Sequence, residues 1–267
     1  MFFFNWTKKE NSEPPKLQIA GLSGLGDRPQ QQDCFAFSDW LDAHLREQRG
    51  ILLTMADGMG GLDHGDEVSS LLVTELQRAF LNRPVDAAPD AWLLELLGQA
   101  NRRVNRLLRD KTPGGSTLIM ALVLGDQLFH LSVGDSRLYL SRGKGLVLLN
   151  REQSYGVKLD LMLVKGILPA SELASHPQRR ALTSYVGMGD LEGVDRNTIP
   201  LQLQDGDQLL LLSDGVFGTL SEEEICACLT EDPERSVRAL EQSVLAKHRH
   251  RQDNYTALIY RHGRAEG

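Results

Sequence analysis

Several features that mark other classes of protein are scarce in this chain of 267 residues. Its three cysteines are too few for a disulfide framework, and Cys226 and Cys228 have no second pair with which to make a zinc site. No apolar run approaches the roughly 18 residues of a membrane span. The apolar residues 1–6 are short and lack the basic start of a signal peptide. These absences favour a cytoplasmic protein with reduced thiols.

A basic surface for nucleic acid is also absent, because the net charge is −7 and no basic cluster offsets it. The glycine-rich residues 21–26 are not followed by a helical pattern, which disfavours a dinucleotide site. Hydrophobic residues make up 41% of the chain, enough for a substantial core. We therefore expect one large globular domain with neither a nucleic-acid partner nor a membrane span.

Short apolar runs predict β-strands along the chain. They lie at residues 16–21, 34–38, 51–56, 117–124, 127–133, 137–141, 146–149, 208–212 and 255–260. The four runs between residues 117 and 149 are separated by turn residues and predict an antiparallel meander. The polar residues 41–48 are expected to form a connection.

Apolar residues at helical spacing predict long helices at residues 66–80 and from Asp90 to about Arg109. Shorter helices are expected at residues 159–165, 222–229 and 234–247, the second with a capping box of Ser221 and Glu224. Runs of strands alternating with runs of helices indicate an α+β fold with antiparallel sheets and helices outside. Residues 1–15 are expected to form a flexible tail and residues 16–262 a single domain, with a loop-rich insertion at about 151–190.

Aspartates recur where the apolar runs end, at Asp33, Asp57, Asp135, Asp214 and Asp253, whereas histidine and cysteine do not cluster. A site built from oxygen ligands suits Mg²⁺ or Mn²⁺ rather than zinc. Several carboxylates around two ions can lower the pKa of a water molecule and make it a nucleophile toward a phosphate ester. Each aspartate taken singly also fits an ordinary turn, where Asp-Gly is common.

Arg28 lies five residues before Asp33 and is a candidate phosphate ligand. Its planar guanidinium can bind phosphate oxygens through two parallel hydrogen bonds. Alternatively, Arg28 pairs with Asp27 or Asp33 on a surface turn. His64, near Asp57 in the sequence, could donate a proton, although an exposed loop histidine is the simpler interpretation.

Six sequence motifs match those of a known family and follow one another in the same order along the chain. They are Gly26-x-Arg28-x-x-Gln31-Gln32-Asp33, Ala56-Asp57-Gly58-Met59-Gly60-Gly61-x-x-x-Gly65, Gly115-Ser116-Thr117, Val133-Gly134-Asp135-Ser136-Arg137-x-Tyr139, Leu211-Leu212-Ser213-Asp214-Gly215-Val216 and Asp253-Asn254-x-Thr256. Over residues 17–260 the chain thereby resembles the metal-dependent protein serine/threonine phosphatases (type 2C). The Gly-Met-Gly-Gly form is similar to the bacterial branch of that family.

The resemblance implies a four-layer α-β-β-α sandwich with two central antiparallel sheets. It also implies hydrolysis of phosphoserine and phosphothreonine at a binuclear centre of Mn²⁺ or Mg²⁺, with two or three ions in all. Phosphorylated proteins would be the substrates and a serine/threonine kinase pathway the partner, and a monomer is expected. Two alternatives are a phosphoprotein-binding pseudophosphatase and a hydrolase of small phosphate esters; intact aspartates favour an enzyme.

Residue roles follow only from the resemblance. Asp57, with the carbonyl of Gly58, would bridge two ions. Asp214 and Asp253 would hold the first ion, and Asp33 would lie near the second. With Asp214, Asp135 would form a third, weaker site, and Arg28 would clamp the substrate phosphate.

The chain departs from the family pattern at a few positions. Gln31 stands where asparagine is usual, and Gln32 where many members have glutamate. Residues 150–154 replace a Thr-x-Asp-His-Ser stretch without its aspartate or histidine, and Met59 stands where eukaryotic relatives have a histidine acid. The departures concern the surroundings of the substrate and leave the aspartates intact.

Overall fold

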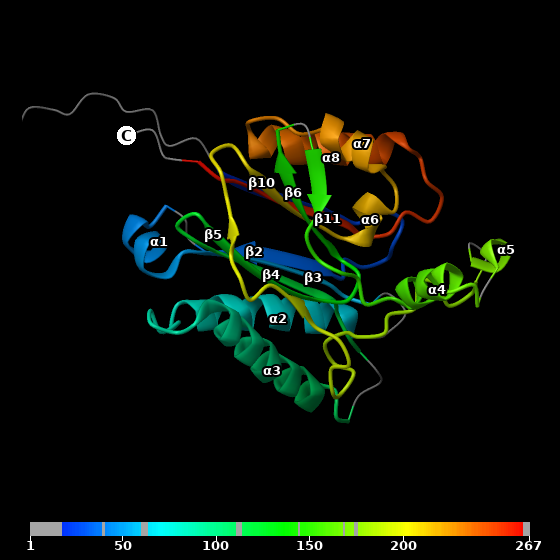
Figure 1. Cartoon of the computed structure of the whole chain (residues 1–267), viewed down its shortest axis with the longest axis horizontal. Helices are drawn as coiled ribbons and strands as arrows, with labels where there is room; N and C mark the ends of the chain where they lie inside the picture. The colour runs from blue at the N-terminus through cyan, green and yellow to red at the C-terminus, as the bar shows by residue number, and fades with distance from the viewer. Residues whose placement is uncertain are drawn as a thin grey trace, which may run out of the picture.

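Two antiparallel sheets stacked face to face form the centre of the computed structural model (Figure 1). The structure describes residues 18–263 apart from 39–40, 60–63, 111–113, 144, 168 and 174–175. The expected tail at residues 1–15 and the glycine pair Gly60-Gly61 therefore lie outside the described residues. None of the helices in the described part combines the length and apolarity needed to cross a bilayer.

The first sheet has five strands. In spatial order they are β1 (Ile19–Gly24), β11 (Tyr255–Arg261), β10 (Gln208–Leu212), β6 (Arg137–Arg142) and β7 (Gly145–Leu148). The second sheet has six: β2 (Asp33–Phe37), β3 (Ile51–Asp57), β4 (Leu118–Leu124), β5 (Gln127–Val133) and β8 (Asp195–Arg196), with β9 (Leu201–Gln202) also on β5. All pairings are antiparallel, as the sequence predicts.

Helices cover the outer face of each sheet (Figure 1). The six-stranded sheet packs against α2 (Gly65–Phe80) and α3 (Pro89–Leu107), and the five-stranded sheet against α7 (Glu222–Ala227) and α8 (Pro233–Ala246). The shorter helices are α1 (Ala43–Arg49), α4 (Tyr155–Val164), α5 (Ala170–Leu173) and α6 (Asp214–Phe217). The four-layer α-β-β-α sandwich is thereby confirmed.

Three apolar clusters hold the layers together, one between the sheets and one under each helical layer. Leu53, Ile119, Leu211 and Leu258 meet between the sheets and are fully buried. The central strands β3, β4, β10 and β11 therefore bury apolar side chains on both faces, which explains why they appear as continuous apolar runs.

Three expected elements differ from the structure. Residues 41–48 do not form a plain connection, because α1 begins after Asp42, whose side chain accepts a hydrogen bond from the Leu45 amide at 3.0 Å. This helix has no buried residues, so it carries no apolar stripe that a pattern search could detect. β1 extends to Gly24 rather than ending at residue 21, and α4 begins at Tyr155, four residues before the expected start.

The expected meander between residues 117 and 149 is wrong in one respect. β4 and β5 form a hairpin in the six-stranded sheet, whereas β6 and β7 form a hairpin in the five-stranded sheet. The chain crosses between the sheets at Gly134-Asp135-Ser136, where Gly134 has a φ of 102°. A residue with a β-carbon rarely adopts this backbone conformation. Asp135 is consequently placed at the edge of both sheets.

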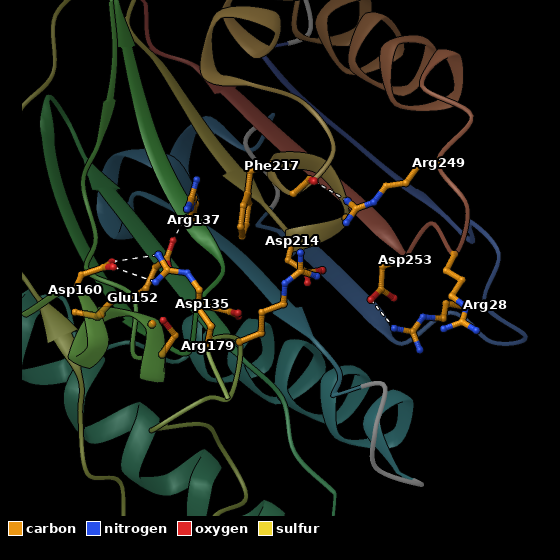
Figure 2. Close-up of a pocket in the computed structure, with 17 residues that line it drawn as sticks. Arg28, Asp135, Arg137, Glu152, Asp160, Arg179, Asp214, Phe217, Arg249 and Asp253 are labelled. Atoms are coloured by element: carbon orange, nitrogen blue, oxygen red, sulfur yellow. Dashed lines mark hydrogen bonds and ion pairs between the residues drawn. The ribbon is translucent and has the colours of Figure 1, made fainter. Parts of the chain in front are cut away.

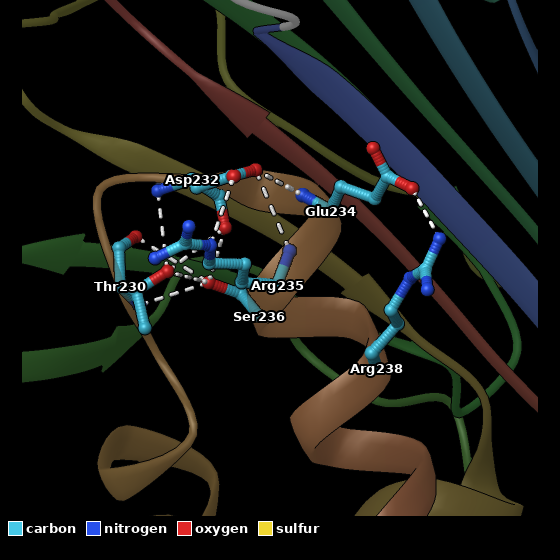
Figure 3. Close-up of polar contacts among 6 residues, drawn as sticks. All are labelled: Thr230, Asp232, Glu234, Arg235, Ser236 and Arg238. Atoms are coloured by element: carbon cyan, nitrogen blue, oxygen red, sulfur yellow. Dashed lines mark hydrogen bonds and ion pairs between the residues drawn. The ribbon is translucent and has the colours of Figure 1, made fainter.

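The start of α8 is fixed by local hydrogen bonds (Figure 3). The Asp232 side chain accepts from the amides of Glu234 at 2.9 Å and Arg235 at 3.4 Å, and Ser236 donates to the Asp232 carbonyl at 3.0 Å. A cap of this kind satisfies amides that the first turn of a helix leaves unpaired. The apolar face of α8, with Val237, Leu240 and Val244, packs against the five-stranded sheet.

Two leucines of α8 provide a matched test of this packing. Leu240 is 1% exposed and Leu245 is 53% exposed. We expect Leu240→Ala to lower the free energy of unfolding by about 2–5 kcal/mol, because it removes buried methyl groups and leaves a cavity. Leu245→Ala should change it by less than about 1 kcal/mol. Urea denaturation measures both, and equal effects would contradict the placement of α8.

Candidate metal centre

The register of β2 and β3 brings two of the predicted aspartates together. Asp33 and Asp57 are direct partners across this antiparallel pair, at the first residue of β2 and the last of β3. Ser213, which follows β10 in the other sheet, donates a hydrogen bond to the Asp33 carboxylate at 2.8 Å. The two carboxylates therefore lie where both sheets end.

The backbone of Asp57 is held by a neighbouring strand. Its amide donates to the Thr117 hydroxyl at 3.0 Å, and its carbonyl accepts from the Thr117 amide and the Ser116 hydroxyl, each at 2.9 Å. A β-carbon on Gly58 would lie 2.5 Å from the Gly65 carbonyl oxygen and 2.6 Å from that of Gln32. Glycine is thus required after Asp57 because three backbone segments converge there.

Asp214 and Asp253 come from the ends of two adjacent strands. Asp214 opens α6 directly after β10, and Asp253 precedes β11. A β-carbon on Gly215 would lie 1.9 Å from the Asn254 carbonyl oxygen, so this glycine allows the two segments to touch. The Asn254 side chain accepts from the Gln32 amide at 2.9 Å, which ties Asp253 to the segment before Asp33.

Asp135 is positioned by the residues that depart from the family pattern. Gln153 accepts from the Gly134 amide at 2.7 Å, and Asn150 donates to the Ser136 carbonyl at 2.9 Å. Glu152 accepts from Arg137 at 2.6 Å. The altered stretch at residues 150–154 therefore supports the turn that carries Asp135.

Gln31, another departure from the family pattern, also has a structural role. Its side chain donates to the Gly24 carbonyl at 3.0 Å and accepts from the Asp33 amide at 2.9 Å. It thus joins the end of β1, in one sheet, to the start of β2, in the other. This bridge helps to hold Asp33 at the shared edge.

The carboxylates perturb one another electrostatically. Burial raises the pKa of Asp57 well above its ordinary value, and the charges of Asp33, Asp214, Asp135 and Asp253 raise it further. Burial likewise raises the pKa of Asp33 to about 6 and that of Asp135 to about 7. Carboxylates gathered in this way favour either protonation or a cation.

One open cavity of about 580 Å³ collects four of the predicted site residues: Arg28, Asp135, Asp214 and Asp253 (Figure 2). Asp33, Asp57 and Gly58 do not line it. The charge of Asp33 raises the pKa of Asp57, and the charges of the three aspartates that line the cavity raise it as well, so these carboxylates lie close together. The predicted set is therefore a single neighbourhood, part of it at the cavity surface and part enclosed.

The donor set fits a hard divalent cation, because every candidate ligand is an oxygen atom. The side chains are not gathered around one point, since Asp253 accepts from Arg28 at 2.6 Å and Asp33 from Ser213. Within the described residues, no group of three or more His, Cys, Asp or Glu side chains has the arrangement of a ready metal cage. The assignment of individual ligands thus stays a prediction.

The cavity also contains residues that the sequence did not single out. Arg179, Arg180, Arg249 and Arg251 line it, together with Arg137, whose guanidinium carbon lies 4.1 Å from the centre of the Phe217 ring. A signal was present in the basic run at residues 247–251, which ends two positions before Asp253. His64, by contrast, does not line the cavity, and its Nδ1 lies 3.3 Å from Oε1 of Glu67.

Comparison with known proteins agrees with this geometry. The family model described as protein phosphatase 2C matches residues 28–252. The chain belongs to the protein phosphatase 2C family. Members of this family are metal-dependent protein phosphatases, so the chain is a protein phosphatase.

Individual relatives of this phosphatase are bacterial. Protein phosphatase PhpP of Streptococcus pneumoniae is 29% identical over 220 residues, which cover 81% of this chain and 85% of that protein. The structure of PppA, described as a key regulatory component of T6SS in Pseudomonas aeruginosa, has a TM-score of 0.72 and 31% identity, and the match covers 91% of this chain and 96% of that one. The catalytic domain of the phosphatase PstP, solved with two manganese ions, shares the fold at 23% identity with a TM-score of 0.70, over 91% of this chain and 96% of that one.

The raised pKa of Asp135 predicts how the metal-free phosphatase responds to pH. Its carboxyl titrates near 7 in the folded chain against an ordinary value of 3.8, so the folded state holds the proton more tightly. Its contribution to stability is complete below pH 4 and is lost as the pH rises through 7. Asp135→Asn should remove this loss, on the order of 1–3 kcal/mol.

Urea denaturation in excess chelator at pH 4.5 and pH 7.5 measures the difference in the free energy of unfolding between Asp135→Asn and the wild type. Asp86 is exposed, so Asp86→Asn is the matched control, and its free energy of unfolding should equal that of the wild type at both pH values. A stability difference between Asp135→Asn and wild type that does not change with pH would contradict the prediction.

Proposed function

We propose that this phosphatase hydrolyses phosphoserine and phosphothreonine in proteins at a binuclear Mn²⁺ or Mg²⁺ centre. The observation that carries the proposal is the convergence of Asp135, Asp214 and Asp253, from separate chain segments, on one cavity that Arg28 also lines. The charges of these three aspartates also act on the enclosed Asp57. Family membership supports the reaction class. Bound divalent cations would supply Lewis-acid stabilisation of phosphoryl oxygens and lower the pKa of a water molecule.

We assign the ligands by their place in the site. Asp57, with the Gly58 carbonyl, is proposed to serve both ions, and Asp214 and Asp253 to complete the first. Asp33 would support the second ion from the position directly opposite Asp57. With Asp214, Asp135 is proposed to provide a third, weaker site, which its place on the cavity wall supports.

Arg28 is proposed to bind the substrate phosphate. Its side chain is 41% exposed at the cavity and donates to Asp253 at 2.6 Å, so it pairs with neither Asp27 nor Asp33. The ion pair holds the guanidinium beside the proposed ligands while leaving other N–H groups to face a phosphate. The contact would orient the phosphoryl group and balance its charge.

The biological setting is also proposed. Phosphorylated proteins are the expected substrates, with a serine/threonine kinase pathway producing them, and we expect the phosphatase to act as a monomer. None of the three cysteines, all of them in the described part of the chain, forms a disulfide; Cys228 is buried and the other two are half-buried, which supports a reducing cytoplasm.

Metal dependence is the first test of the proposed function. Hydrolysis of a phosphothreonine peptide should cease in excess EDTA and return with Mn²⁺ or Mg²⁺. Asp57→Asn should lower kcat about a hundredfold or more, the scale seen when charge stabilisation of a transition state is removed. The exposed Asp190→Asn variant is the control. Full activity without metal, or a wild-type rate from Asp57→Asn, would contradict the proposal.

The role of Arg28 can be tested separately. Arg28→Ala should raise KM for a phosphopeptide about ten- to a hundredfold, which corresponds to the roughly 1.5–3 kcal/mol of a charge-assisted hydrogen bond. Arg28→Lys should restore only part of the loss, because it keeps the charge but not the planar fork. Because Arg28 also bonds Asp253, a parallel Mn²⁺ titration must show unchanged metal affinity. An unchanged kcat/KM would remove Arg28 from the site.

A further inference from the structure

The cavity wall carries more arginines than it has acidic residues to pair with them. Six arginines and five acidic residues line the cavity. Three arginines form ion pairs with acids of the same wall: Arg28 with Asp253 at 2.6 Å, Arg137 with Glu152 at 2.6 Å and Arg179 with Asp160 at 3.0 Å (Figure 2). The remaining acids are Asp135 and Asp214, both proposed metal ligands.

Three arginines of the wall are thereby left over: Arg180, Arg249 and Arg251. Within the described part of the chain, none of the three forms an ion pair with a carboxylate within 4.0 Å. We call these three residues the arginine rim. The surplus is local, because the whole chain carries a net charge of −7. Cations on Asp135 and Asp214 would make the cavity more positive still.

The segment that carries Arg249 and Arg251 is fixed to the metal-centre loops. Arg249 donates to the Gly218 carbonyl at 2.6 Å and to the Thr219 hydroxyl at 3.0 Å, just after Asp214 on the chain. Gln252 donates to the Gly215 carbonyl at 2.9 Å. Figure 2 shows Arg249 on the same side of the cavity as Asp214. The rim is therefore held in place beside the proposed reaction centre.

Arg180 reaches the same neighbourhood from the insertion. Its charge acts on Asp214, as do those of Arg28 and Arg249, and together they oppose the rise in the pKa of Asp214 that burial causes. Arg180 and Arg251 are exposed, so an incoming substrate can contact their guanidinium groups. Residues from two distant parts of the chain thus present unpaired positive charge at one opening.

We propose that the arginine rim binds a second anionic group of the substrate, beside the phosphate that is hydrolysed. The preferred substrates are then phosphopeptides with an acidic side chain or a second phosphate close to the scissile phosphoresidue. This inference rests on the proposed function and names its substrate class. Guanidinium groups suit both partners, because their planar fork matches carboxylate and phosphate oxygens.

Three phosphothreonine peptides that differ only in their flanks test the proposal. The two residues on each side of the phosphothreonine are glutamate in the first, glutamine in the second and lysine in the third. Wild-type kcat/KM with Mn²⁺ should be about three- to tenfold higher for the glutamate peptide than for the glutamine peptide, the modest scale of solvent-exposed ion pairs. The lysine peptide should be the poorest substrate. Raising the salt concentration should shrink the preference, since salt screens exposed charges.

Variants locate the source of the preference. Arg180→Gln and Arg251→Gln should each bring the kcat/KM of the glutamate peptide closer to that of the glutamine peptide. Arg102→Gln removes an exposed arginine of α3 that does not line the cavity, and it should keep the wild-type ratio. Arg28→Ala should lower kcat/KM for both peptides by the same factor, because the proposed contact of Arg28 is with the scissile phosphate.

The outcomes separate the inference from the function on which it rests. Hydrolysis of all three peptides at equal kcat/KM, or a preference that survives both rim variants, would overturn the inference alone. No hydrolysis of any peptide with metal present would overturn the proposed function and the inference together. A fourth peptide carries a non-hydrolysable phosphonate analogue of phosphoserine in place of the flanking glutamates, so that only the phosphothreonine is cleaved. A larger rim-dependent preference for it assigns the rim to a second phosphate, whereas no gain over glutamate assigns the rim to acidic side chains.

Discussion

Burial of like charges is the constraint on which the rest of this structure depends. Asp33 and Asp57 face each other across β2 and β3 at the shared edge of the two sheets, and Asp33 is 7% exposed. Gathering carboxylates in a poorly solvated place is unfavourable unless hydrogen bonds or cations compensate. The apolar core between the sheets stabilises the fold enough to hold them there, and Ser213 supplies a hydrogen bond from the opposite sheet.

The metal-centre loops are built around the same constraint. Gly58 and Gly215 allow backbone segments to approach within distances that a β-carbon would block. Gln31 and Asn254 join the loops from the two sheets through side-chain hydrogen bonds. Glycine and amide residues therefore determine how closely the aspartates approach, which explains why they recur in the motifs.

Much of the fold could be predicted from the sequence because its strongest signals are local. β5 and β10 match their predicted bounds, and α2 follows an apolar stripe against the six-stranded sheet. The first strand was predicted to end at Gly21, three residues too early, because the glycines that follow suggested a loop; β1 continues to Gly24. The crossing of the chain at Gly134 was missed, because successive hairpins have the same pattern whether they share a sheet or not.

For the site, the order of the motifs identified the aspartates. Asp33 and Asp57 lie at strand ends, Asp135 lies between two strands and Asp253 shortly before β11, as expected, whereas Asp214 begins the short helix α6. The basic run at residues 247–251 was a signal for Arg249, but Arg180 has no such run around it, and no local pattern shows which arginine faces a cavity. Their positions depend on contacts between residues far apart in the sequence, such as that of Arg249 with Gly218. Gln153 and Asn150 appeared only as departures, and the structure shows that they support the turn of Asp135.

A crystal structure of the protein with Mn²⁺, with anomalous scattering recorded at the manganese absorption edge, tests the central claim most directly. We expect two strong anomalous peaks, each within ordinary coordination distance of an Asp57 carboxylate oxygen, one of them also beside Asp214 and Asp253. Anomalous peaks confined to other parts of the surface, with the aspartates bonded only to one another and to Arg28, would contradict it.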